Sequence, residues 1–202
     1  GDLGGSLKNV SAHKLGSTAI SNAIKKSNIK ASDINEIIMG QVLTGGAGQN
    51  PARQAAMDAG IPKETPSYVV NQVCGSGLRS IASGYHSILS GSSNIVLAGG
   101  QESMSQSPHV VHLRNGKKLG DTSLVDSMIK DGLWDAFNGY HMGITAENVA
   151  QKFQITRKDQ DKFAFDSQTK ALKAQKENKF DDEIVPYTIQ LKKGTAIFKK
   201  DE

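Results

Sequence analysis

Short apolar runs alternate with segments of helical spacing over the first 100 residues, and this alternation constrains the fold more than any other feature of the sequence. The runs "INEIIMGQVL", "SYVVNQV" and "NIVLAGG" begin at residues 34, 67 and 94, and each predicts a β-strand. Their apolar character is nearly continuous, which implies burial on both faces. The sequence therefore predicts an α/β fold with a mostly parallel sheet covered by helices.

Three helices are expected in the same part of the chain. Apolar residues recur at helical spacing over 12–27, and another helix is expected over 76–90. A third, shorter helix begins with Asn50 as its cap and Pro51 in its first turn, and Gly60 ends it. Helices therefore alternate with the strands, as in a sheet whose two faces are both covered.

Beyond the third strand the pattern changes. Residues 101–143 are polar and rich in glycine, and long irregular segments of this kind usually form lids or binding loops. Two more helices follow, one from about Thr145 and one opened by a capping box at Thr156. A strand is expected over 183–191, where Pro186 would confine it to an edge or a bulge.

Composition narrows the class of protein. The chain of 202 residues has one cysteine, which excludes an intrachain disulfide framework, and no Cys/His spacing suggests a metal site. Its net charge is +4, but Lys and Arg interleave with Asp and Glu and only 5% of residues are aromatic, so a nucleic-acid partner is not expected. No stretch approaches the roughly 20 apolar residues of a membrane span. We therefore expect a cytoplasmic protein without a membrane partner, and a leader upstream of Gly1 stays open.

Cys74 lies where a strand gives way to a helix, directly before Gly75, Ser76 and Gly77. Free N–H groups at a helix start favour an anion, and so would make the thiol a better nucleophile. The glycines leave room for an incoming acyl group, and nearby N–H groups are candidate oxyanion donors. A lone cysteine is nevertheless more often a packing residue. Local sequence therefore leaves two interpretations open, a nucleophile and a core residue.

Four segments together resemble the thiolase family, and within it the biosynthetic acetyl-CoA acetyltransferases. They are "NQVCGSGLRSI", "VLAGGQESMSQSPH", "DGLWDAFNGYHMGITAENVA" and "FDDEIVPYTI", and the likeness runs in unbroken order along essentially the whole chain. It implies a layered α/β fold with an inserted loop domain. Residues 1–102 would form the N-terminal half of the core, without most of the family's first strand. Residues 103–202 would form the loop domain, which binds CoA and mediates oligomerisation.

The resemblance also implies a reaction. Thiolases condense two acetyl-CoA molecules reversibly to acetoacetyl-CoA and free CoA through an acyl-cysteine intermediate, and Cys74 matches the acylated nucleophile. A thioester on sulfur divides a difficult condensation into two steps, because thiolate is both a good nucleophile and a good leaving group. The CoA thioester is the substrate, so no further cofactor is expected.

Other residues match supporting positions of the family. Leu133, His141 and Met142 match positions that line the acyl and pantetheine pocket. For His141 a surface or helix-capping role is equally open, and Met142 fits equally as core filler. The resemblance also implies that Gln49, Asn50 and Arg53 support the catalytic loop at a dimer interface.

The segment 112–121 resembles the loop through which biosynthetic thiolases form tetramers, as dimers of dimers. Its basic residues would raise the positive potential where CoA phosphates arrive, although an exposed basic turn is the simpler interpretation. These residues are Arg114, Lys117 and Lys118.

Besides the shortened first strand, the sequence departs from the family pattern in its motifs. The motifs CxGGG and GHPxGxSG, which carry the second catalytic cysteine and the general-base histidine, are absent. We therefore expect an N-terminal half that holds the nucleophile without its base and is inactive alone. Two alternatives stay open: a degradative 3-ketoacyl-CoA thiolase, and a non-catalytic half that binds CoA or another subunit. Gln168 stands where potassium-using members have tyrosine, so no potassium site is expected.

Overall fold

The computed structural model describes residues 1–191 and 194–200. The chain divides into two compact units, one formed by Gly1–Gly132 with Tyr187–Glu202 and the other by Leu133–Pro186. The division expected from the sequence lies elsewhere, between residues 102 and 103. It distinguishes a core half from a loop domain by their expected functions, and it stays a prediction.

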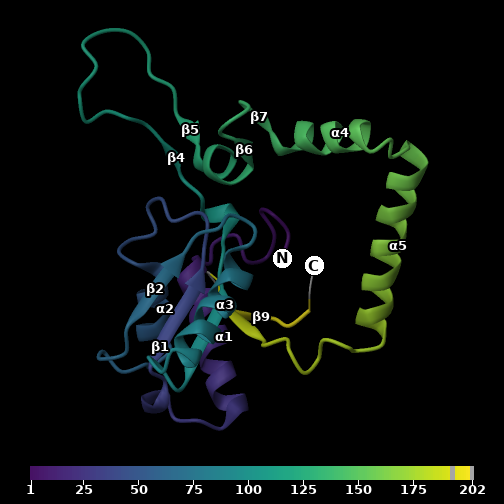
Figure 1. Ribbon diagram of the computed structural model, residues 1–202. Helices are drawn as coiled ribbons and strands as arrows, with labels where there is room; N and C mark the ends of the chain where they lie inside the picture. The colour runs from purple at the N-terminus through teal and green to yellow at the C-terminus, as the bar shows by residue number, and fades with distance from the viewer. Residues whose placement is uncertain (192–193, 201–202) are drawn as a thin grey trace. The chain divides into compact units, whose positions relative to one another are not determined.

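A three-stranded parallel sheet forms the centre of the first unit (Figure 1). Its strands are β1 (Glu36–Gly40), β2 (Ser67–Val70) and β3 (Val96–Gly100), in the order β2-β1-β3. β1 is parallel to both neighbours, with Ile37 opposite Ser67 on one side and Leu97 on the other. The predicted strands and their parallel pairing are therefore confirmed.

Three helices cover this sheet: α1 (Ala12–Ser27), α2 (Pro51–Asp58) and α3 (Ser76–Leu89). Ile37 and Met39 of β1 pack in one buried cluster with Ile20 of α1 and with alanines of α2. Successive side chains of a strand point to opposite faces, so Ile38 and Gly40 face α3. The hydrophobic gain of burying one isoleucine fully is about 1.5–3 kcal/mol. This double burial explains why the strand sequences are apolar throughout.

Two of the three helices have an asparagine cap, α2 at its start and α1 at its end. The Asn50 side chain accepts a hydrogen bond from the Arg53 N–H and caps α2, as predicted. α1 ends at Ser27, and its C-cap Asn28 adopts the left-handed conformation (φ 53°) that asparagine tolerates better than most residues.

Short elements connect and follow these helices in the first unit. The 3₁₀ turns are η1 (Ala31–Asp33) and η2 (Met104–Gln106), and β4 (His109–Val110) pairs antiparallel with β5 (Val125–Asp126). A π-helix, η3 (Met128–Leu133), leads into the second unit. β8 (Tyr187–Gln190) pairs antiparallel with β9 (Thr195–Phe198). The strand expected from residue 183 therefore begins only after Pro186, since proline has no N–H to donate.

The second unit consists of a hairpin and two helices. β6 (Trp134–Asp135) pairs antiparallel with β7 (Tyr140–His141), and α4 (Met142–Lys152) and α5 (Arg157–Lys176) follow. The capping box at Thr156 is confirmed, because the Thr156 hydroxyl accepts from the Asp159 N–H and the Asp159 carboxylate accepts from the Thr156 N–H, both at 3.2 Å. α4 begins three residues before Thr145, where it was expected to start.

Among the residues that the structure describes, no helix combines the length and the apolar character needed to cross a membrane. Within the same residues, no group of three or more His, Cys, Asp or Glu side chains gathers as a metal ion would require.

Candidate active site

Cys74 lies at the carboxyl end of the parallel sheet, in the short connection between β2 and α3. β2 ends at Val70, α3 begins at Ser76, and the Cys74 residue is exposed to solvent. In open α/β sheets, ligands bind in the crevice outside the carboxyl ends of the strands. The exposure removes the interpretation of Cys74 as a buried core residue within this chain.

Glycine at the end of β1 lets the first turn of α3 lie against the sheet. A Cβ atom added to Gly40 would be 2.4 Å from the carbonyl carbon of Ser76 and 2.5 Å from the nitrogen of Gly77. The Ser80 hydroxyl lies 2.7 Å from the carbonyl oxygens of both Gly77 and Gly99. The start of α3 is therefore fixed on the sheet, and with it the segment that carries Cys74.

The connection that precedes Cys74 makes a tight turn. Val73 adopts a left-handed conformation with φ 49°, and its N–H donates to Oδ1 of Asn71 at 2.9 Å. The N–H of Gly75 donates to the Gln72 carbonyl, and that of Ser76 donates to the Val73 carbonyl. The chain thus reverses within four residues and enters α3.

The first turn of α3, which follows Cys74 directly, offers free backbone donors. Among the described residues, the N–H groups of Gly77 and Leu78 have no hydrogen-bond partner outside their helix. A Cβ added at Gly77 would meet no atom within 4 Å, so open space lies in front of this residue. Such a helix start can stabilise a thiolate or a developing oxyanion. This geometry fits the expected role of the glycines, which stays a prediction.

Polar side chains join the ends of β1 and β3, and sequence reasoning did not single them out. The Glu102 carboxylate accepts hydrogen bonds from the N–H groups of Val42 and Leu43, at 2.8 and 3.2 Å. Nε2 of Gln101 donates to Oε1 of Gln41 at 2.8 Å, and both glutamines are buried. The signal in the sequence was one polar residue directly after each strand, Gln41, Asn71 and Gln101, at the edge where parallel strands end together.

The predicted pocket residues Leu133, His141 and Met142 are brought together by the β6–β7 hairpin of the second unit. Trp134 is opposite His141, so Leu133, which precedes Trp134, lies beside the position where α4 begins with Met142. His141 Nδ1 accepts a hydrogen bond from the Gly143 N–H at 3.0 Å and caps α4. This cap explains the early start of the helix, and a pocket role for the three residues stays a prediction.

The turn of that hairpin is built around Asp135. Its carboxylate accepts hydrogen bonds from the Asn138 side chain at 2.7 Å and from the N–H groups of Asn138 and Phe137, each at 2.9 Å. These bonds, that of the Asn138 side chain first, lower the pKa of Asp135 from its ordinary value of 3.8. The hairpin turn therefore favours the ionised form of the Asp135 carboxylate.

Asn50 and Arg53 bond to the segment that leads into β2. Nδ2 of Asn50 donates to the Ser67 carbonyl at 2.8 Å, and the Arg53 guanidinium donates to the carbonyls of Thr65 and Lys63 at 2.7 and 2.6 Å. The Gln49 carbonyl accepts from the Gln54 side chain. Within this chain Asn50 and Arg53 hold the amino end of β2, and the support of a catalytic loop at a dimer interface by Gln49, Asn50 and Arg53 stays a prediction.

Arg114, Lys117 and Lys118 lie in the exposed loop between β4 and β5, which extends away from both strands in Figure 1.

A cavity of about 230 Å³ elsewhere in the first unit is lined in part by Gln41, Leu43 and Pro108, and no predicted site residue lines it. Cys74 itself is exposed to solvent.

Comparison with known proteins decides the family. The model of the thiolase N-terminal domain matches residues 1–202. The chain belongs to the thiolase family. It is 52% identical, over 202 residues, to the acetyl-CoA acetyltransferases of Rhizobium meliloti (strain 1021) and Shinella zoogloeoides. The crystal structure of the Bacillus anthracis acetyl-CoA acetyltransferase matches the whole chain with a TM-score of 0.96 at 37% identity.

These thiolases are longer than this chain. All of the chain is matched, but it spans 51% of the Rhizobium protein, 52% of the Shinella protein and 51% of the Bacillus chain. The family and the layered α/β fold of the thiolases, both predicted from the sequence, are confirmed.

Proposed function

We propose that this chain is the N-terminal half of an acetyl-CoA C-acetyltransferase in which Cys74 carries the acyl group. The observation that supports the proposal most is the exposure of Cys74 at the carboxyl end of a parallel sheet, directly before a helix start. The thiolases that the chain resembles are named acetyl-CoA acetyltransferases, which favours acetyl-CoA as the substrate.

In the proposed reaction the Cys74 thiolate attacks the carbonyl carbon of acetyl-CoA. The C–S bond to CoA breaks, and CoA leaves as a thiolate that takes up a proton. A second acetyl-CoA then loses a proton from its methyl group, and the resulting carbanion attacks the acetyl-cysteine carbonyl. Acetoacetyl-CoA forms and the Cys74 thiolate is released. The N–H groups of Gly77 and Leu78 are the proposed donors to the oxyanion of each addition step.

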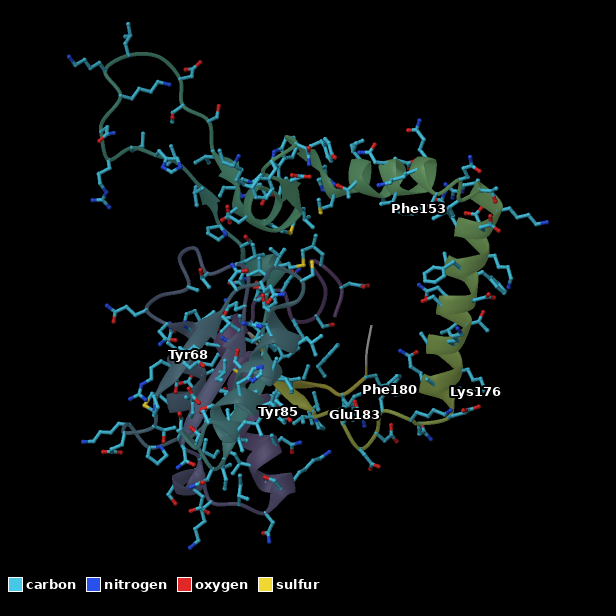
Figure 2. The ribbon with its side chains drawn as sticks, viewed as in Figure 1. Tyr68, Tyr85, Phe153, Lys176, Phe180 and Glu183 are labelled. Carbon is cyan, nitrogen blue, oxygen red and sulfur yellow. The ribbon has the colours of Figure 1, made fainter. Side chains whose placement is uncertain are left out.

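Proton removal needs a base that we do not assign to any residue of this chain. We propose that the base belongs to the part of the longer thiolases that these 202 residues do not match. The outer face of α3 supports such a missing half, since Leu78, Ile81 and Tyr85 follow helical spacing and are 75, 55 and 60% exposed (Figure 2 labels Tyr85). Contiguous exposed apolar side chains of this kind mark an interaction surface.

The remaining residues have proposed supporting roles. Leu133, His141 and Met142 would line the acyl and pantetheine pocket, and the basic loop with Arg114, Lys117 and Lys118 would attract CoA phosphates and join subunits into a tetramer. Gln49, Asn50 and Arg53 would support the catalytic loop through the segment before β2. The CoA thioester is the substrate, and we propose neither a resident cofactor nor a metal. We propose a cytoplasmic enzyme.

Mass spectrometry of the full-length protein that contains these 202 residues, after brief exposure to acetyl-CoA, tests this function. We expect one acetyl adduct, on the peptide that contains Cys74, and none in the Cys74→Ser variant. An adduct on another residue, or unmodified protein at every time of exposure, would overturn the proposal. Cleavage rates with acetoacetyl-CoA and a long-chain 3-ketoacyl-CoA then separate the biosynthetic enzyme from a degradative thiolase.

The half-length match also favours a second candidate, a non-catalytic module that binds CoA or another subunit. This candidate predicts CoA binding by the intact protein without acetylation of Cys74. Calorimetry with CoA, run beside the acetylation assay, distinguishes the two.

A further inference from the structure

We propose that Asn71 and Ser76 are positioning residues, which hold Val73 in its left-handed conformation and so fix the direction in which Cys74 presents its thiol to the acyl donor. The inference rests on the proposed function, because it assigns a purpose to the turn that precedes the nucleophile. Neither residue needs to touch the substrate.

The conformation of Val73 is unusual for its residue type. Five residues other than glycine have positive φ in the described part of the chain, and the other four are asparagine or glutamine: Asn28, Asn50, Gln154 and Asn178. These short or flexible polar residues lie at helix ends, where a left-handed residue is common. A β-branched residue avoids this region because its Cβ substituents crowd the backbone. Val73 therefore needs an external restraint.

Packing does not supply that restraint, because the Val73 residue is 48% exposed. Hydrogen bonds do. Oδ1 of Asn71 accepts from the Val73 N–H at 2.9 Å. The Ser76 hydroxyl donates to the Val73 carbonyl at 2.5 Å and accepts from the Gln72 N–H at 2.8 Å. Both backbone polar groups of Val73 are thus bound by side chains, one from each side of the turn.

Ser76 is well placed for this task. It is only 4% exposed, and its hydroxyl uses both its donor and its acceptor capacity on the turn. An alanine at position 76 would leave the Gln72 N–H without this acceptor. The first turn of α3 lies against Gly40, so the backbone at position 76 cannot shift to make up for the lost hydrogen bond.

Asn71 connects the turn to the other two strand ends. Its Nδ2 donates to the Val42 carbonyl at 3.4 Å, and the Val42 N–H is held by the Glu102 carboxylate at 2.8 Å. Val42 follows β1 and Glu102 follows β3. Hydrogen bonds therefore connect the turn before Cys74 to the ends of the other two strands of the sheet. A turn needed only to connect β2 with α3 could carry glycine at position 73, as the chain does at 75 and 77.

The test measures two rates on Cys74 in the intact protein: acetylation by acetyl-CoA and alkylation by iodoacetamide. Acetylation requires a bound donor in one orientation, whereas a small alkylating reagent approaches an exposed thiol from many directions. For Asn71→Ala and Ser76→Ala we expect acetylation at saturating acetyl-CoA to fall by roughly 10- to 100-fold, the size of loss that misplaced reacting groups cause. Alkylation should change by less than about threefold, and the Kd of CoA should stay the same.

Three further variants keep the proposal falsifiable if a truncation unfolds the protein. Asn71→Asp keeps the Oδ1 acceptor and should retain most of the acetylation rate. Val73→Gly, added to Asn71→Ala, should recover part of the lost rate, because glycine adopts positive φ without restraint. Ser90→Ala, at the exposed far end of α3, is the matched control and should behave as the parent protein.

Acetylation at the parent rate in Asn71→Ala and Ser76→Ala would overturn the positioning role. Equal losses of acetylation and alkylation, with no recovery by Val73→Gly, would also overturn it, because that pattern indicates only a damaged fold. Absence of acetylation in the parent protein is a different result, and it refutes the proposed function itself.

Discussion

Gly40, the last residue of β1, lies directly against the backbone of Ser76, the first residue of α3. A Cβ at position 40 would be 2.4 Å from the Ser76 carbonyl carbon. Real Cβ atoms do not approach other atoms so closely, and both sides of this contact are backbone. The contact therefore sets how near the nucleophile segment lies to the end of the sheet.

Gly40→Ala should destabilise the protein strongly. Overpacking typically costs 1–3 kcal/mol, and we expect at least about 3 kcal/mol here because no side chain can move aside. Urea unfolding of the purified variant measures the loss. A free energy of unfolding within about 0.5 kcal/mol of the parent would show that α3 is not held at this distance from β1.

Gly77→Ala is the matched variant on the other side of the same contact, and it should fold normally. A Cβ there meets no atom within 4 Å, and alanine inside a helix is more stable than glycine by up to about 1 kcal/mol. Acetylation of Cys74 should nevertheless slow down, because the new methyl group takes up open space at the helix start that we propose for the acyl group. An unchanged acetylation rate would contradict a role for this space in acyl binding.

Asn50→Ala should lower the stability of the first unit by about 1–2 kcal/mol, the usual cost of losing a helix cap. Two bonds disappear together, the cap on the Arg53 N–H and the bond to the Ser67 carbonyl. Asn50→Asp keeps the capping oxygen and loses only the donor, so its loss should be smaller. Thermal unfolding of both variants gives the comparison, and equal losses would show that the bond to Ser67 carries the effect.

The turn around Asp135 should open in acid. Its pKa is lowered in the folded state, so its contribution to stability is complete above the ordinary value of 3.8 and is lost as the pH falls through the lower folded value. We expect the Phe137 and Asn138 amides to lose their NMR signature of hydrogen bonding in that acid range. Asp135→Asn should remove the pH dependence of these signals. A pH dependence that persists in the variant would point to another titrating group.

Features that depend on neighbours in sequence could be predicted. The Asn50 cap and the capping box at Thr156 were both recognised, because each joins a side chain to backbone groups three residues away. The start of α4 was placed three residues late because histidine is not among the usual caps, although the helix-capping role left open for His141 is the one that the structure shows. The thiolase family was recognised from four motifs, which carry more information than any single residue does.

By itself, the sequence determined the parallel α/β class, the family and the place of Cys74 between a strand and a helix, because periodicity and local motifs are written along the chain. Only the tertiary structure decided how Cys74 is held. The contacts of Gly40 with Ser76, Asn71 with Val42 and Glu102 with Val42 join residues 29 to 60 positions apart in sequence. Such contacts form only when the strand ends meet at one edge of the sheet, so no local pattern reveals them.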